Sequence, residues 1–226
     1  MRGTAYGVGV GPGDPGLMTL RAVSVIRACG VVALPGKHPQ ETAAYKIAVQ
    51  AVPELPEKIL LPLEMPMVRD RSIMEKAHRA AAGRIEAYLD QGQDVACLTL
   101  GDPSVYSTFG YIQRHLEDDG YPVEIVPGVP SFCAAAARLK VPLAQWDEPL
   151  HILPAAHGDK LPAGRGACVL MKPAGGLWAS VRDSGRRVWM VENCGMPGER
   201  VWDGAENLPD EAGYFSILIA RAIPHN

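Results

Sequence analysis

Short apolar runs alternate with amphipathic stretches along the first part of the chain. Apolar runs at 4–10, 31–34, 59–61, 95–100 and 123–126 have the length and composition of buried strands. Between them, the residues at about 19–29, 41–51, 70–91, 105–119 and 131–139 have a helical pattern of apolar and polar positions. Because strands and helices take turns, the pattern predicts a parallel sheet covered by helices.

The clearest helix is expected at 70–91. Its apolar residues recur on one stripe, and Gly92 is a typical end signal. The residues of the stripe are Ile73, Ala77, Ala81, Ile85 and Leu89.

Beyond Pro142 the pattern changes. Strand-like runs occur at 151–153, 167–171, 187–191, 199–202 and 215–221, and a short helix is expected between Met171 and Arg186. The late strands follow one another through short connections, which favours a mixed or antiparallel sheet. The fold class is therefore α/β with two α/β domains, a parallel-sheet domain at 1–145 and a mixed-sheet domain at 146–226.

The composition narrows the classes of partner. The net charge of −3 argues against a nucleic-acid partner, because such proteins usually present a basic face. No apolar stretch reaches the length of a membrane span, and no signal peptide opens the chain. The cysteines are odd in number and contain no CxxC pair, which is typical of thiols in a reducing compartment. We expect a cytoplasmic protein without a membrane partner.

The turn at 11–16 formally matches GxGxxG between a strand and a helix, which raises a dinucleotide-binding hypothesis. Pro12 and Pro15 lack backbone N–H groups, so this loop is a poor pyrophosphate cradle. No acidic residue occurs between Pro15 and Gln40, where the ribose-binding carboxylate is expected. The stretch 30–37 also fails as a P-loop, because five residues separate its glycines and His38 replaces the magnesium-binding Ser or Thr. Both nucleotide hypotheses are rejected.

The stretch Leu98–Thr108 has the strongest ligand-binding signature. An apolar run leads into a small-residue turn, where Gly101 allows a close backbone approach. We expect Asp102 to cap the following helix and Pro103 to occupy its first position. Open α/β sheets bind ligands at the carboxyl ends of their strands, so a ligand site is predicted at this turn.

Three motifs in this order resemble those of the tetrapyrrole methylase family. They are the opening Gly7–Pro15 with Leu17, Thr19 and Leu20, the turn Gly101–Asp102–Pro103, and Pro127–Gly128–Val129–Pro130–Ser131. Within the family, the segments 106–112 and 131–139 are most similar to the branch that methylates carbon 20 of precorrin-2 or of its cobalt complex, cobalt-factor II. The resemblance is strong over about 7–149 and thinner beyond.

The resemblance implies an S-adenosylmethionine-dependent C-methyltransferase of cobalamin biosynthesis, with the methyl donor in a cleft between the two domains. It also implies a small-molecule tetrapyrrole substrate and a homodimer. Carried onto this chain, the cofactor contacts fall at Pro12, Leu100, Gly101, Asp102, Val105, Tyr106, Pro130, Ser131 and Met171.

The chemistry needs few further groups. The methyl group is already activated, so the protein has mainly to align it with a nucleophilic carbon. Asp102 and Tyr106 are the candidates for accepting the carbon-20 proton, with water as the alternative. The substrate's many carboxylates call for cations, and Lys37, His38 and Lys172 are candidates. No metal-ligand motif is present.

Two rival hypotheses stay open at this point. One is another tetrapyrrole methylase of the same fold, acting at a different ring carbon. The other is a non-catalytic tetrapyrrole-binding protein that does not bind the methyl donor.

Overall fold

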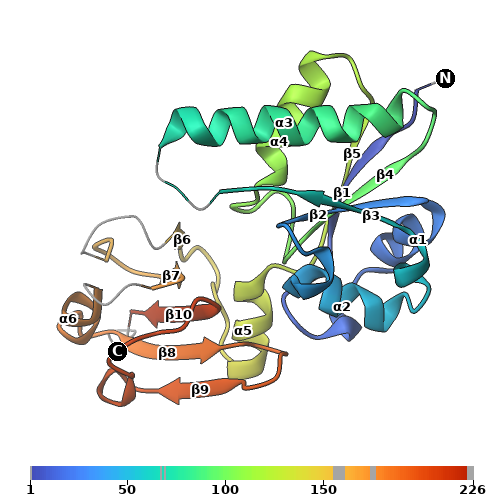
Figure 1. The fold of residues 1–226 in the computed structure, drawn as a ribbon. Helices are drawn as coiled ribbons and strands as arrows, with labels where there is room; N and C mark the ends of the chain where they lie inside the picture. Colours follow the sequence, from blue (N-terminus) through green and yellow to red (C-terminus); the bar gives the residue numbers. More distant parts are fainter. Residues whose placement is uncertain (1, 67, 69, 155–160, 174–176, 223–226) are drawn as a thin grey trace. The chain divides into compact units, whose positions relative to one another are not determined.

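The computed structural model describes residues 2–66, 68, 70–154, 161–173 and 177–222. The chain divides into two compact units, Met1–Pro130 and Ser131–Asn226, and Figure 1 shows their elements. The described residues of the first unit form five strands: β1 Ala5–Gly9, β2 Val31–Pro35, β3 Ile59–Leu63, β4 Val95–Thr99 and β5 Val123–Val126. Every pairing among them is parallel, in the order β3-β2-β4-β1-β5. This confirms the predicted parallel sheet.

Helices cover both faces of this sheet. Helices α1 (Leu20–Ala28) and α2 (Ala43–Ala51) share a core with Val8, Val32 and Leu98. Helices α3 (Arg71–Leu89) and α4 (Phe109–Asp118) share another with strand residues such as Val31 and Cys97. Strand residues alternate between the two cores, as the pleat of a sheet requires. Burial on both faces explains why the strands read as continuous apolar runs in the sequence.

Side-chain caps fix where three of these helices begin. Thr19 Oγ accepts a hydrogen bond from the Ala22 amide at 3.1 Å, and Thr42 Oγ accepts one from the Tyr45 amide at 3.2 Å. The Asp70 carboxylate accepts from the Ser72 amide at 2.8 Å. Each cap satisfies an amide that has no partner inside the helix.

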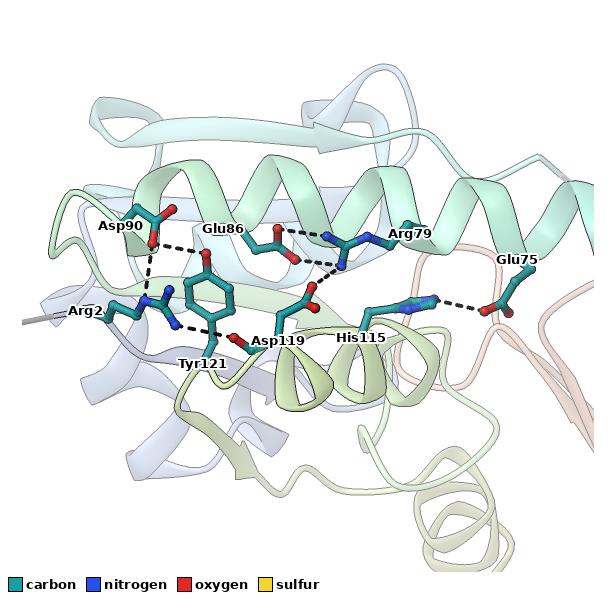
Figure 2. Close-up of polar contacts among 8 residues, drawn as sticks. All are labelled: Arg2, Glu75, Arg79, Glu86, Asp90, His115, Asp119 and Tyr121. Carbon is teal, nitrogen blue, oxygen red and sulfur yellow. Dashed lines mark hydrogen bonds and ion pairs between the residues drawn. The ribbon is translucent and has the colours of Figure 1, made fainter.

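Helices α3 and α4 pack against each other through apolar side chains and a row of ion pairs (Figure 2). The Arg79 guanidinium on α3 contacts Glu86 of the same helix at 2.8 Å and Asp119, just after α4, at 2.5 Å. His115 of α4 lies 3.2 Å from Glu75 of α3. The two contacts between the helices, Arg79–Asp119 and His115–Glu75, are partly exposed, so each contributes modestly, but together they help to fix the register of α4 against α3.

The stripe predicted for α3 is correct except at its N-terminal end. Ala81, Ile85 and Leu89 are buried, whereas Ile73 is 47% exposed. His78 is buried instead, with 3% of its surface exposed, and its ring stacks on Tyr111 of α4. A polar residue on the inner face was missed because the apolar pattern could not show that an aromatic partner would cover it.

The described residues of the second unit form a five-stranded mixed sheet and the helices α5 and α6. Its elements are α5 Ser131–Leu139, β6 Leu150–Pro154, β7 Ala167–Met171, α6 Leu177–Arg182, β8 Arg187–Glu192, β9 Arg200–Asp203 and β10 Ser216–Arg221. The strand order is β6-β7-β10-β8-β9, and β6–β7 is the one parallel pair among these pairings. The predicted mixed sheet is confirmed.

Segment 131–149 belongs to the second compact unit. Helix α5 packs on β8 and β10. Arg221 of β10 is 8% exposed and donates to the Pro142 carbonyl at 2.8 Å, to Gln145 at 2.7 Å and to Glu148 at 2.5 Å. The division between the two compact units therefore falls before α5. The sequence pattern predicts a domain boundary later in the chain, at 145/146, and that boundary stays a prediction.

Candidate functional site

Three loops of the first unit meet at the carboxyl ends of β1, β4 and β5. The loop after β1 and the turn after β4 bond to each other, since the Gly101 amide donates to the Gly11 carbonyl at 2.8 Å and the Gly11 amide donates to the Gly101 carbonyl at 3.3 Å. The hydroxyl of Thr19 donates to the Pro127 carbonyl, after β5, at 3.3 Å. The structure thus joins the three sequence motifs of the first unit at one edge of the sheet.

At the carboxyl ends of β1 and β4 the direction in which the chain adds strands to the sheet reverses. The chain leaves β1 for β2 on one side of the sheet and leaves β4 for β5 on the other side, while β1 and β4 are neighbours. In open α/β sheets such a switch point is the usual ligand site. The position of the Gly101 turn therefore fits the prediction made from its sequence.

Close backbone packing explains the glycines of this site. A Cβ atom added to Gly9 would lie 2.6 Å from the Gly101 carbonyl oxygen, and one added to Gly128 would lie closer still. Gly101 itself has φ +72°, a left-handed conformation that glycine adopts without strain. The three loops can therefore touch only because no side chain separates them.

Asp102 fastens the turn after β4 to the loop after β5. One carboxylate oxygen accepts hydrogen bonds from the Ser104 amide at 2.8 Å and the Ser104 hydroxyl at 2.5 Å, and the other accepts from the Gly128 amide at 2.9 Å. The residue is 8% exposed. Burial alone would raise the pKa of Asp102, but the bonds from Ser104 and Gly128 outweigh it and hold the pKa below 3.8.

Asp102 does not cap a helix, which corrects the sequence prediction. Helix α4 begins at Phe109, not near Pro103 or Val105, and residues 102–108 form a turn. Ser107 Oγ accepts from the Phe109 amide at 3.1 Å and lies 3.0 Å from Thr99 Oγ, so Ser107 satisfies the first helical amide. The Asp-Pro-Ser sequence favours a tight side-chain turn as much as a helix start, and here the turn is formed.

The structure places most of the predicted cofactor contacts around this turn. Pro12 is buried, and Leu100 and Val105 are half-buried. Tyr106 is 59% exposed and has φ +47°, an uncommon backbone conformation for a non-glycine residue. Pro130 ends the loop after β5. Gly128, Ser104 and Ser107 were missed as site residues, although Gly128 lies inside the third motif.

The remaining predicted contacts lie in the second unit. Ser131 is the first residue of α5, and Met171 ends β7. Lys172 follows with φ +56°, and its ammonium donates to the Tyr214 hydroxyl at 2.5 Å and lies 3.9 Å from the centre of that ring. The Lys172 amide also donates to the Ser216 carbonyl at 2.9 Å, so both its backbone and its side chain are held at the end of the sheet.

The other predicted substrate cations are exposed. Lys37 follows β2 and lies 3.8 Å from Glu64, with 73% of its side chain exposed. His38 is also exposed and makes no capping bond with its side chain. Their place after β2, the neighbour of β4, is at the same edge of the sheet as the Gly101 turn.

The described residues contain no cluster of three His, Cys, Asp or Glu side chains that could hold a metal ion. In the same part of the chain, no helix combines the length and the apolar character needed to cross a lipid bilayer.

Comparison with known proteins gives the class to which this protein belongs. A family model for Tetrapyrrole (Corrin/Porphyrin) Methylases matches residues 4–208. A probable cobalt-precorrin-2 C(20)-methyltransferase of Methanocaldococcus jannaschii is 39% identical over 66% of this chain. A precorrin-2 C(20)-methyltransferase of a Sinorhizobium species is 30% identical over 96% of this chain and 94% of its own length. The crystal structure of uroporphyrin-III-C-methyltransferase from Thermus thermophilus covers 98% of this chain and 93% of its own, with TM-score 0.71 and 28% identity.

The chain therefore belongs to the tetrapyrrole methylase family, whose members use S-adenosylmethionine as methyl donor. Its two α/β units agree with that family's fold. The alignment with the Methanocaldococcus relative spans 63% of that protein's length.

The residues at the Gly101 turn fit such a donor. Leu100 and Val105 offer half-buried apolar surface for a ring, and the buried carboxylate of Asp102 lies between them in the chain. A cationic sulfonium is compatible with this carboxylate, since the charges are opposite.

Proposed function

We propose that this protein transfers a methyl group from S-adenosylmethionine to carbon 20 of precorrin-2 or cobalt-factor II in cobalamin biosynthesis. The observation that supports the reaction class is the union of three family motifs at the switch point of the first sheet. The choice of carbon 20 is supported by the names of the Methanocaldococcus and Sinorhizobium relatives.

We assign the methyl donor to the loops around Gly101 and to the start of α5 and the end of β7. The residues that would hold it are Pro12, Leu100, Gly101, Asp102, Val105, Tyr106, Pro130, Ser131 and Met171. When bound, the donor supplies a methyl group on a positively charged sulfur. The protein then needs no covalent intermediate and has mainly to align two reacting centres.

The reaction forms one carbon–carbon bond and breaks one carbon–sulfur bond. The electron-rich carbon 20 provides the electron pair for the new bond, sulfur keeps the pair of the broken bond, and the carbon-20 proton leaves to a base. Asp102 is a weak base, because its pKa lies below 3.8 and both its oxygens already accept hydrogen bonds. We assign Asp102 to positioning and leave the proton to Tyr106 or water.

We further propose a homodimer that acts in the cytoplasm. The dimer rests on the family resemblance, and the cytoplasm on the odd, scattered cysteines, which the structure leaves as unpaired thiols. Light scattering on the purified protein measures the mass in solution, and a monomeric mass would refute the dimer.

The deciding experiment is a methylation assay. Purified protein is mixed with methyl-labelled S-adenosylmethionine and precorrin-2 or cobalt-factor II, and the product is analysed by NMR. We expect one labelled methyl group at carbon 20, and excess S-adenosylhomocysteine should suppress it. A label at another ring carbon would overturn the regiochemistry. Binding of precorrin-2 without any binding of S-adenosylmethionine would favour a non-catalytic carrier.

A further inference from the structure

A groove of about 580 Å³ adjoins the Gly101 turn within the first unit. Its lining begins at Pro103 in the Gly101 turn, continues along the first turns of α4 with Tyr111 and Arg114, and ends at Ile125 of the edge strand β5. We call this the Arg114 groove. Because it shares residues with the Gly101 turn, a molecule in the groove would lie directly beside that turn.

The charge of this groove is positive. Among its lining residues Arg114 is the one with a charged side chain. Within the described part of the chain, no carboxylate lies within ion-pair distance of Arg114, whereas Arg27, Arg79 and Arg138 each have at least one. Arginine stays protonated at any physiological pH, and its planar donors match a carboxylate. The groove thus presents an uncompensated cation to solvent.

The wall beside Arg114 is held rigidly. The guanidinium lies 6.0 Å from the centre of the Tyr111 ring. The Tyr111 ring also stacks on His78 of α3, with the ring centres 4.7 Å apart and an angle of 5° between the planes. The Arg79–Asp119 ion pair and the His115–Glu75 contact in Figure 2 further hold α4 on α3. A preformed wall lowers the entropy cost of binding, which is what a ligand site needs.

We propose that the Arg114 groove receives a carboxylate side chain of the tetrapyrrole, with Arg114 as its pairing cation and Tyr111 and Ile125 as apolar walls for its methylene groups. The proposal rests on the function proposed above, because it places the macrocycle beside the Gly101 turn. It assigns an anchor that sequence reasoning did not name, since Arg114 lies on a helix face and not in a loop. Complementary charge identifies the occupant as anionic.

The test is a comparison of Arg114→Gln with Arg114→Lys and wild type. For Arg114→Gln we expect the KM for precorrin-2 to rise roughly tenfold, which corresponds to the loss of one charged hydrogen bond, while kcat changes little. The affinity for S-adenosylmethionine should not change. Arg114→Lys keeps the charge and should recover part of the loss. Arg182→Gln, which removes an exposed arginine of α6 in the other unit, is the matched control and should behave as wild type.

A binding measurement separates this proposal from the proposed reaction. Uroporphyrin III carries a carboxylate on every peripheral side chain and quenches tryptophan fluorescence on binding, so its Kd can be measured without turnover. We expect Arg114→Gln to weaken it by roughly tenfold. Wild-type affinity and KM in Arg114→Gln would overturn the Arg114 assignment even if carbon 20 is methylated. Absence of methylation by wild type, with the Kd effect present, would overturn the reaction and leave the anchor standing.

Discussion

The Asp102 carboxylate and the Gly128 amide are 2.9 Å apart, although 26 positions separate them in the chain. Through this bond the turn after β4 holds the loop after β5. The same carboxylate also closes its own turn through Ser104. Asp102 therefore acts as a clip that joins the turn after β4 to the loop after β5, and its replacement should affect both of these motifs.

Replacing Asp102 by Asn tests the clip. The amide keeps the shape of the side chain but offers a single acceptor oxygen, so either Ser104 or Gly128 loses its partner. We expect a loss of about 1–3 kcal/mol in the free energy of unfolding. The affinity for S-adenosylmethionine, measured by calorimetry, should fall with it. Wild-type affinity in a destabilised Asp102→Asn protein would show that the clip serves folding alone.

The same carboxylate makes stability depend on pH. Since the pKa of Asp102 in the folded protein is below 3.8, the folded state binds its proton less readily than the unfolded state. The stabilisation is complete above the unfolded pKa and is lost as the pH falls through the folded pKa. Urea unfolding at a series of pH values below about 5 measures this dependence, and the free energy of unfolding should fall less for Asp102→Asn than for wild type. An equal fall of the free energy of unfolding in both proteins would contradict this.

Gly128 should not tolerate a side chain. A Cβ there would run into the carbonyl oxygen of Gly101 and the backbone of Gly9, and backbone atoms cannot move aside cheaply. We expect Gly128→Ala to cost about 2 kcal/mol or more and to abolish donor binding. Gly83→Ala is the control, because no atom lies within 4 Å of the added Cβ and the residue is inside α3. It should gain up to about 1 kcal/mol. Thermal and urea unfolding distinguish the two.

His78 should weaken the fold at mildly acidic pH. Its ring is buried with both nitrogens unpartnered among the described residues, and burial lowers its pKa below 6.5. The neutral form is therefore favoured in the folded state. The contribution of the neutral His78 ring to stability is fully present above pH 6.5, and it is lost as the pH drops from there towards the folded pKa. In His78→Phe, which keeps an aromatic ring against Tyr111, this decline should disappear. A decline of unchanged size would place its origin elsewhere.

Cys133 should be the thiol that alkylating reagents reach first. It is exposed on α5, whereas Cys29, Cys97, Cys168 and Cys194 are buried. Burial also raises the pKa of the Cys29 thiol to about 12, so little reactive thiolate forms there. Iodoacetamide treatment of the native protein should give one adduct, located at Cys133 by mass spectrometry. Cys133→Ser should give none on the same timescale, and an early adduct at a buried cysteine would contradict the packing.

The sequence predicted the strands better than the details of the site. Burial on both faces makes a parallel strand a continuous apolar run, so β1, β2, β4 and β5 were recognisable. The start of α4 was not, because Asp102 and Pro103 suit a helix start and a tight turn equally well. The Asp102–Gly128 bond joins distant positions, and no local pattern contains it.

The place of β1 between β4 and β5 has a consequence for how the protein is made. Among the strands of this sheet β1 is synthesised before the others, yet its partners are β4 and β5, whose residues follow roughly ninety and more positions later. Until Val126 has emerged, β1 lacks a neighbour on one side and its polar backbone groups stay open to other chains. A nascent or truncated chain that stops before β5 should therefore be prone to aggregate, and its dependence on chaperones should end once β5 is added.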